Sequence, residues 1–214
     1  MNIIKTLEDY NYQYQQSIES PAKYWNDIAE NFTWKKKWDK TCSGDFNNLD
    51  IKWFEGGELN ITDNCLDRHL ENNANQVALI YEANNPEEET RKFTYQELHS
   101  EVCKFSNVLK SQGVKKGDRV CFYMGMVPEL LIGVLATARI GAIHSVVFGG
   151  FSAQALAGRI QDCNASILIT NDGSLRGNKI IPLKEIADKA VKSCPSIKNV
   201  LVHQRANNSI NMNK

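Results

Sequence analysis

The sequence has no long hydrophobic segment. Its longest apolar run covers residues 130–138 and ends at Arg139, far short of the roughly 20 residues that a helix needs to span a bilayer. The first ten residues place Lys5, Glu8 and Asp9 between isolated apolar side chains, unlike the charged start and apolar centre of a signal peptide. These absences predict a soluble, cytoplasmic protein that does not bind a membrane.

Net charge and paired cysteines are also missing. The 25 basic and 25 acidic residues cancel to a formal charge of zero, so no extended positive field favours nucleic acid as a partner. The six cysteines contain no Cys-x-x-Cys pair, which argues against a zinc site and against a disulfide framework. Small molecules or proteins are the expected partners, and the oligomeric state stays open.

The short motifs of several common chemistries are absent. The sequence lacks Gly-x-x-x-x-Gly-Lys-Ser/Thr, Gly-x-Gly-x-x-Gly, Gly-x-Ser-x-Gly and His-Glu-x-x-His, which mark phosphate loops, dinucleotide sites, serine hydrolases and zinc proteases. The four histidines, His69, His99, His144 and His203, lie on predicted helices or strands without a neighbouring acid or thiol in the sequence. We therefore expect these histidines to be structural, and we name no metal ligand in this chain.

The patterns that are present divide the chain into two parts. Residues 1–62 hold all four tryptophans and show no sustained hydrophobic period, which predicts an irregular extension whose aromatic side chains act as anchors. Residues 63–214 alternate strand and helix patterns, and this alternation predicts an α/β fold. The near-continuous apolar strands favour a mostly parallel sheet with helices on both faces.

End signals mark the elements of the second part. Thr94 and Glu97 form a capping box before a helix with apolar residues at helical spacing, and Gly113 is placed to end it. Another helix is expected from a cap at Asp63 or Asn64 to about residue 73. Further strands are predicted over residues 77–81, 93–95, 120–124, 144–148, 166–170 and 199–203, and further helices over residues 129–140, 152–162 and 182–193.

Three loops follow predicted strands, at the edge where parallel sheets bind ligands. The first covers residues 124–128, the second residues 148–152 and the third residues 172–179. In the second loop, two glycines permit close backbone approach, and the flanking aromatic faces can stack on a planar ring. In the third loop, an Arg together with a Lys suits a phosphate group. A plain strand-to-helix turn, a tight turn with core phenylalanines and a solvated charged loop would give the same three patterns.

Several blocks in a fixed order resemble one enzyme family. Residues 64–70 read Asn-Cys-Leu-Asp-Arg-His-Leu, residues 144–152 read His-Ser-Val-Val-Phe-Gly-Gly-Phe-Ser, and residues 176–179 read Arg-Gly-Asn-Lys. Broader blocks accompany them, such as Tyr-Gln-Glu-Leu at 95–98 and Lys-Gly-Asp-Arg-Val at 116–120. From about residue 20 to residue 203, the chain resembles acetyl-CoA synthetases of the adenylate-forming superfamily.

The resemblance implies the activity of an AMP-forming acetate-CoA ligase. Such enzymes activate acetate with ATP and Mg²⁺ to acetyl-adenylate and pyrophosphate, and then transfer the acetyl group to CoA with release of AMP. The resemblance also assigns two loops to CoA, one holding its 3′-phosphate and one beside its adenine. The matching residues are Arg176, Gly177, Asn178 and Lys179 for the phosphate, and Phe148, Gly149 and Gly150 for the adenine.

The chain also departs from the family pattern. Asn178 stands where a Gly or Ala is usual, and Gly125 stands where a Pro is common. The family's Gly-rich ATP phosphate loop, adenine and ribose contacts, acetate pocket and adenylation lysine are all expected beyond residue 214. The resemblance therefore implies no catalytic residue in this chain, and we expect an amino-terminal portion that is inactive alone. Two alternatives remain open: a stand-alone CoA-binding module, and part of a propionate-CoA ligase.

The missing catalytic residues give a direct test. We predict that the purified 214-residue chain forms no acetyl-CoA from acetate, ATP and CoA, as measured by a coupled assay for AMP. A full-length member of the family, assayed in parallel, is the positive control. Reproducible turnover by the 214-residue chain would contradict the prediction.

Overall fold

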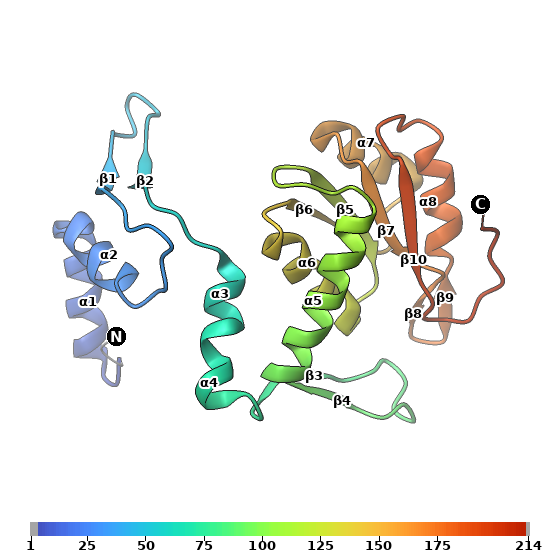
Figure 1. Cartoon of the computed structure of the whole chain (residues 1–214), viewed down its shortest axis with the longest axis horizontal. Helices are drawn as coiled ribbons and strands as arrows, with labels where there is room; N and C mark the ends of the chain where they lie inside the picture. Colours follow the sequence, from blue (N-terminus) through green and yellow to red (C-terminus); the bar gives the residue numbers. More distant parts are fainter. Residues whose placement is uncertain (1–3, 213–214) are drawn as a thin grey trace. The chain divides into compact units, whose positions relative to one another are not determined.

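The chain folds as two compact units, residues 1–68 and 69–214 (Figure 1). The structure is a computed structural model that describes residues 4–212. The division follows Arg68, six residues beyond the predicted boundary at residue 62. Each unit has its own helices and its own strands.

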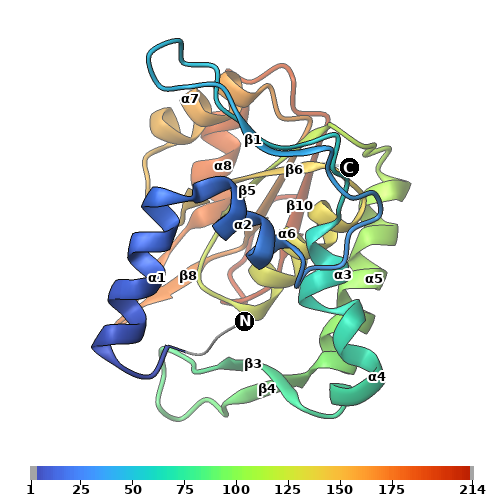
Figure 2. The same ribbon diagram turned by 90° about the vertical axis from the view of Figure 1, so that its left-hand side faces the viewer.

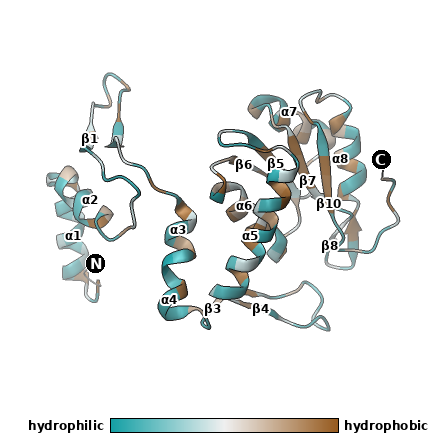
Figure 3. Ribbon diagram, in the orientation of Figure 1, coloured by the Kyte–Doolittle hydropathy of each residue, from teal (hydrophilic) through white to brown (hydrophobic). Residues whose placement is uncertain are grey.

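The first unit contains two helices that the hydrophobic pattern does not indicate. α1 (Leu7–Glu19) buries none of its residues and is mostly hydrophilic in Figure 3, so no apolar period marks it. It begins at a capping box, in which the hydroxyl of Thr6 and the carboxylate of Asp9 each accept from the other's backbone N–H. α2 (Pro21–Ala29) starts with a proline, whose fixed φ suits this position. Residues 7–29 therefore differ from the irregular extension that was expected.

Aromatic side chains pack against one another in the first unit. The ring centroids of Trp34, Trp38 and Phe54 lie between 4.7 and 5.5 Å apart. The indole N–H of Trp34 also donates to the carbonyl of Ala29 at 2.9 Å. Since a buried indole needs such a partner, the geometry fits tryptophans that anchor the chain locally.

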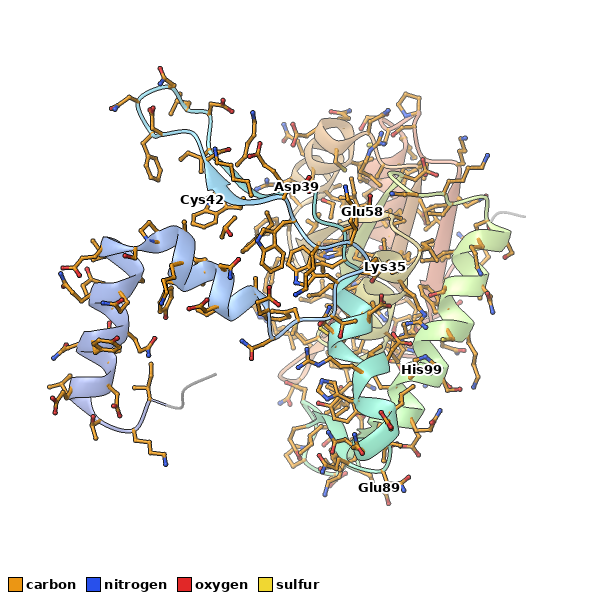
Figure 4. All side chains as sticks on the ribbon, turned by 60° about the vertical axis from the view of Figure 1, so that its left-hand side comes forward. Lys35, Asp39, Cys42, Glu58, Glu89 and His99 are labelled. Atoms are coloured by element: carbon orange, nitrogen blue, oxygen red, sulfur yellow. The ribbon has the colours of Figure 1, made fainter. Side chains whose placement is uncertain are left out.

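A short hairpin completes the middle of this unit. β1 (Lys40–Ser43) and β2 (Lys52–Glu55) pair antiparallel. Next to it, the backbone N–H of Lys35 donates to the carbonyl of Glu58 at 2.8 Å, and the two residues lie close together in Figure 4. The strand pairing and this hydrogen bond hold residues 35–43 beside residues 52–58.

The helix expected from residue 63 to residue 73 is broken into three pieces. α3 (Ile61–Cys65) begins earlier than predicted, because the side chain of Asn60 accepts from the N–H of Thr62. A 3₁₀ turn (Asp67–His69) and α4 (Leu70–Asn73) follow. The predicted cap at Asp63 or Asn64 is therefore wrong.

The second unit begins with a β-hairpin and a long helix. β3 (Val77–Tyr81) pairs antiparallel with β4 (Arg91–Thr94), and the two lie side by side in Figure 2. α5 (Tyr95–Ser111) begins at the capping box of Thr94 and Glu97. The predicted hairpin and helix are both confirmed.

Four parallel strands form the central sheet, in the order β10-β7-β5-β6. β5 comes first along the chain, and β6, which follows, pairs with one edge of it. β7 then pairs with the other edge of β5, and β10 pairs with the outer edge of β7. This reversal leaves a topological switch point at the carboxyl end of β5. The strands and connecting helices are β5 (Arg119–Met124), α6 (Pro128–Arg139), β6 (Ile143–Phe148), α7 (Ala153–Cys163), β7 (Ile167–Asn171), α8 (Leu183–Val191) and β10 (Asn199–His203).

Helices cover both faces of the sheet. α5 packs with α6 and α7 packs with α8, and Figure 1 shows the two pairs on opposite sides of the strands. Cys121 and Tyr123 of β5 pack with Leu156 and Leu183 in the buried cluster under α7 and α8. No helix in the described part of the chain is both long and apolar enough to cross a membrane. The predicted α/β fold with a covered parallel sheet is confirmed.

Close packing on the other face gives a test of the fold. A methyl group at Gly133 in α6 would lie 2.5 Å from Cε1 of the buried Phe122 ring. We predict that Gly133→Ala lowers the free energy of unfolding by about 1–2 kcal/mol, because overpacking costs about 1–3 kcal/mol and alanine recovers at most about 1 kcal/mol of helix propensity. Urea denaturation followed by circular dichroism measures the change.

The matched control is Gly158→Ala in α7, where a methyl group would meet no atom within 4 Å. This substitution should raise the free energy of unfolding by up to about 1 kcal/mol. If both substitutions shifted stability equally, the packing explanation for Gly133 would be wrong.

Candidate functional site

The three predicted loops meet at one cavity of about 370 Å³ beside the carboxyl ends of β5 and β6. Residues 124–127 line it from the first loop, Phe148 and Gly149 from the second, and Ser174–Arg176 from the third. Residues 81–84, at the end of β3 and in the loop after it, also line the cavity. The position agrees with the rule that ligands of parallel sheets bind at the carboxyl ends of the strands.

The second loop approaches the first through a glycine. A methyl group at Gly149 would lie 2.4 Å from the carbonyl oxygen of Met124, so a larger residue would push the two loops apart. Gly150 has a φ of +145°, which L residues rarely adopt. The hydroxyl of Tyr123 donates to the carbonyl of Phe151 at 2.6 Å and holds the end of the loop.

The ring of Phe148, at the start of this loop, is accessible to solvent. Its side chain is 59% exposed, and its ring meets Phe151 edge-on with centroids 5.8 Å apart. An exposed ring at the rim of a cavity offers a face on which a planar heterocycle can stack. Core packing is thus excluded for Phe148, although it was one interpretation of the sequence.

The third loop is a β-hairpin, and this corrects its description as an irregular loop. β8 (Ser174–Arg176) pairs antiparallel with β9 (Lys179–Ile181), and Arg176 lies directly opposite Lys179. Gly177 has a φ of +55° at the first position of the two-residue turn, where tight hairpins favour glycine. Asn178, the residue that departs from the family pattern, occupies the second position without a positive φ.

The hairpin places two positive charges face to face. Residues directly opposite in an antiparallel pair project from the same face, and like charges there destabilise the pair. Both Arg176 and Lys179 are exposed, and within residues 4–212 neither side chain makes an ion pair. An anion bound between them would remove the repulsion.

The structure brings only part of the predicted set to the cavity wall. Phe148, Gly149 and Arg176 line the cavity. Lys179 stands beside Arg176 through the strand pairing. The remaining three residues shape the two turns and do not line the cavity: Gly150, Gly177 and Asn178.

Asn84 is a cavity residue that sequence reasoning missed. Its side-chain amide donates to the carbonyl of Gly177 at 3.2 Å, and its side-chain oxygen accepts from the N–H of Gly177 at 3.4 Å. It belongs to the charged loop after β3, 93 residues away in sequence. No local pattern marks such a distant contact.

Asp172 was named only as the start of the third loop, yet it organises the residues that follow β10. Its buried carboxylate accepts from the backbone N–H groups of Gly173, Arg205, Ala206 and Asn208 at 2.7 to 3.2 Å. Burial alone would raise the pKa of Asp172, but these four hydrogen bonds outweigh it and lower the pKa below the usual range. The carboxylate therefore stays ionised and holds the polar segment in place.

A larger cavity of about 900 Å³ is lined by residues of α5, α6, β7 and β10 and by none of the seven predicted site residues. The side-chain oxygen of Asn171 accepts from the N–H of Gly125, so its amide nitrogen faces His203 Nδ1 at 2.8 Å. His203 Nε2 lies 3.8 Å from Glu129 Oε2, while Arg91 donates to Glu129 Oε1 at 2.9 Å. This network fits the structural role predicted for His203.

Two family models match adjacent parts of the chain. A model described as AMP-binding enzyme covers residues 66–213, and one described as acetyl-coenzyme A synthetase N-terminus covers residues 10–65. The chain is 51% identical over 209 residues to the acetyl-coenzyme A synthetase of Gamma-proteobacterium EBAC31A08, covering 97% of this chain and 32% of that protein. It is 51% identical over 213 residues to that of Parvibaculum lavamentivorans, covering 99% of this chain and 33% of that protein.

A solved structure shares the fold. The acetoacetyl-CoA synthetase from Streptomyces lividans superposes with a TM-score of 0.84 at 23% identity, over 92% of this chain and 30% of that chain. The chain thus spans about a third of the length of the relatives that it matches. It corresponds to their amino-terminal part, as the match to the N-terminus model indicates.

The buried carboxylate beside the third loop gives a test that uses pH. We predict that Asp172→Asn lowers the free energy of unfolding at pH 7 by about 1–3 kcal/mol, because a charged acceptor of four N–H groups is lost. Since the folded-state pKa is lowered, the carboxylate stabilises the fold above its ordinary pKa of about 3.9 and loses this effect as pH falls further.

Urea denaturation at several pH values measures both parts of the prediction. The difference between the wild-type chain and Asp172→Asn should shrink below about pH 4. A difference that stayed constant from pH 7 to pH 3 would show that the charge of Asp172 does not contribute.

Proposed function

We propose that this chain, which belongs to the family of AMP-binding enzymes, supplies the CoA-binding loops of an acetate-CoA ligase. Such a ligase joins acetate to CoA with cleavage of ATP to AMP and pyrophosphate. ATP, acetate and Mg²⁺ are assigned to no residue here. Among residues 4–212, no group of three or more His, Cys, Asp or Glu side chains is arranged to hold a metal ion.

The opposed pair Arg176 and Lys179 carries this proposal. A terminal phosphate is the ligand that two facing cations suit best, because guanidinium binds its oxygens in bidentate fashion and ammonium adds a compact charge. CoA differs from most adenine nucleotides in carrying a 3′-phosphate on its ribose. The pair stands next to the cavity of the three loops, so a phosphate held there leaves the attached nucleoside at the cavity mouth.

The adenine ring has a matching surface on the second loop. Phe148 presents an exposed ring at the cavity, and Gly149 lines the wall beside it. Stacking of a base on an aromatic ring contributes about 1–3 kcal/mol per base, as judged by alanine substitution in nucleic-acid complexes. Base stacking and phosphate pairing together favour a nucleotide over a simple anion.

These contacts bind the end of CoA that does not react. The 3′-phosphate and adenine lie far from the thiol along the CoA chain, so the loops supply affinity and orientation and take no part in bond making. Binding energy from such remote groups positions the reacting end. In a complete ligase, loss of Arg176 should therefore raise the KM for CoA more than it lowers kcat.

Calorimetric titration tests the assignment on the 214-residue chain. CoA should bind more tightly than 3′-dephospho-CoA, which lacks only the 3′-phosphate. Arg176→Ala should weaken CoA binding about 10- to 100-fold, since a charged hydrogen-bonding partner contributes about 1.5–3 kcal/mol, and should leave 3′-dephospho-CoA binding nearly unchanged.

Lys189→Ala is the control for net charge. Lys189 is an exposed residue of α8 that does not line the cavity, so its loss should affect neither ligand. Equal affinity of the wild-type chain for CoA and 3′-dephospho-CoA would overturn the assignment of Arg176 and Lys179.

A further inference from the structure

The turn between Arg176 and Lys179 is held from outside the hairpin. Gly177 separates the two charges, and both of its backbone polar groups bond the side chain of Asn84. One side-chain amide thus satisfies an N–H and a C=O of the same residue, as a neighbouring strand would. Since the hairpin itself has only three residue pairs, this outside contact is a large part of what fixes the turn.

The loop that carries Asn84 is itself anchored. The guanidinium of Arg205 donates to the hydroxyl of Tyr81 at 3.1 Å, before Asn84 in the chain, and to the carboxylate of Glu88 at 2.7 Å, after it. The backbone N–H of Arg205 is held in turn by Asp172, at 2.7 Å. Asn84 therefore projects from a loop that is fixed on both sides.

We infer that Asn84 is a positioning residue for the phosphate-binding pair, an inference that rests on the proposed function. Repulsion between Arg176 and Lys179 favours opening of the hairpin when no anion is present. The two hydrogen bonds from Asn84 oppose that opening, so the pair stays in the geometry that a phosphate needs. Asn84 makes this contribution through its two hydrogen bonds to Gly177.

The selectivity between CoA and 3′-dephospho-CoA separates positioning from a merely structural role. General destabilisation would weaken both ligands equally, whereas a displaced pair weakens only the ligand with the 3′-phosphate. Asn84→Leu keeps the size of the side chain and removes both hydrogen bonds. It should lower the ratio of the CoA affinity to the 3′-dephospho-CoA affinity about tenfold, which corresponds to about 1.4 kcal/mol.

A measurement without ligand accompanies the titration. Hydrogen exchange at the Gly177 amide, followed by NMR in the 214-residue chain, should become faster in Asn84→Leu because its acceptor is gone. Asn85→Ala is the matched control: within residues 4–212, its side chain accepts only from the N–H of Glu87 in the same loop. It should change neither the affinity ratio nor the exchange of Gly177.

The outcomes distinguish the role of Asn84 from the CoA site itself. If the wild-type chain and Asn85→Ala select for CoA while Asn84→Leu loses that selectivity and exchanges faster, Asn84 positions the pair. If Asn84→Leu keeps the wild-type ratio, Asn84 has no positioning role, although the CoA site stands. If the wild-type chain binds both ligands alike, the proposed function is wrong, and the role of Asn84 falls with it.

Discussion

The burial of β5 is the constraint on which the second unit depends. Its residues from Val120 to Met124 are buried, with β6 and β7 bonded to its two edges and helices over both faces. A strand closed in on four sides can present functional groups only where it ends. The first backbone group past that end, the N–H of Gly125, is bonded by the side chain of Asn171 at the end of β7. The three loops of the candidate site are therefore built around the end of β5.

Small residues then decide how closely the loops at that exit approach one another. A methyl group at Gly149 would meet the Met124 carbonyl at 2.4 Å, and one at Gly125 would meet Ser174 Oγ at 2.4 Å. The second and third loops both press against the first. A proline at position 125 would carry a Cβ into the same space, so the glycine here and the present place of Ser174 belong together.

The sequence predicts those parts whose causes are local. The capping box of Thr94 and Glu97, the apolar strands and the glycines after β6 act within a few residues, and the elements that they indicate are present. α1 has no buried face, so its sequence does not need the periodic apolar residues by which other helices are recognised. The β8–β9 hairpin has three residue pairs and charges at its turn, which resembles a solvated loop when read as a sequence.

The unpredicted parts of the site depend on long-range contacts. Asn84 acts on a residue 93 positions away, and Asp172 acts on residues 33 to 36 positions away. Asn and Asp occur in many loops, and their partners become evident only when the fold brings the segments together. The resemblance to known enzymes indicates Arg176 and Lys179, but it says nothing of the side chain that supports the turn between them.

The contacts of Asp172 also set an order of events during synthesis of the chain. A ribosome makes residue 172 well before residues 205–208, whose N–H groups the carboxylate binds in the folded protein. Until that later segment leaves the exit tunnel, Asp172 must stay hydrated and its end of β7 must remain open to water. The third loop and the segment that anchors Glu88 therefore reach their final arrangement only after residues 205–208 have been made.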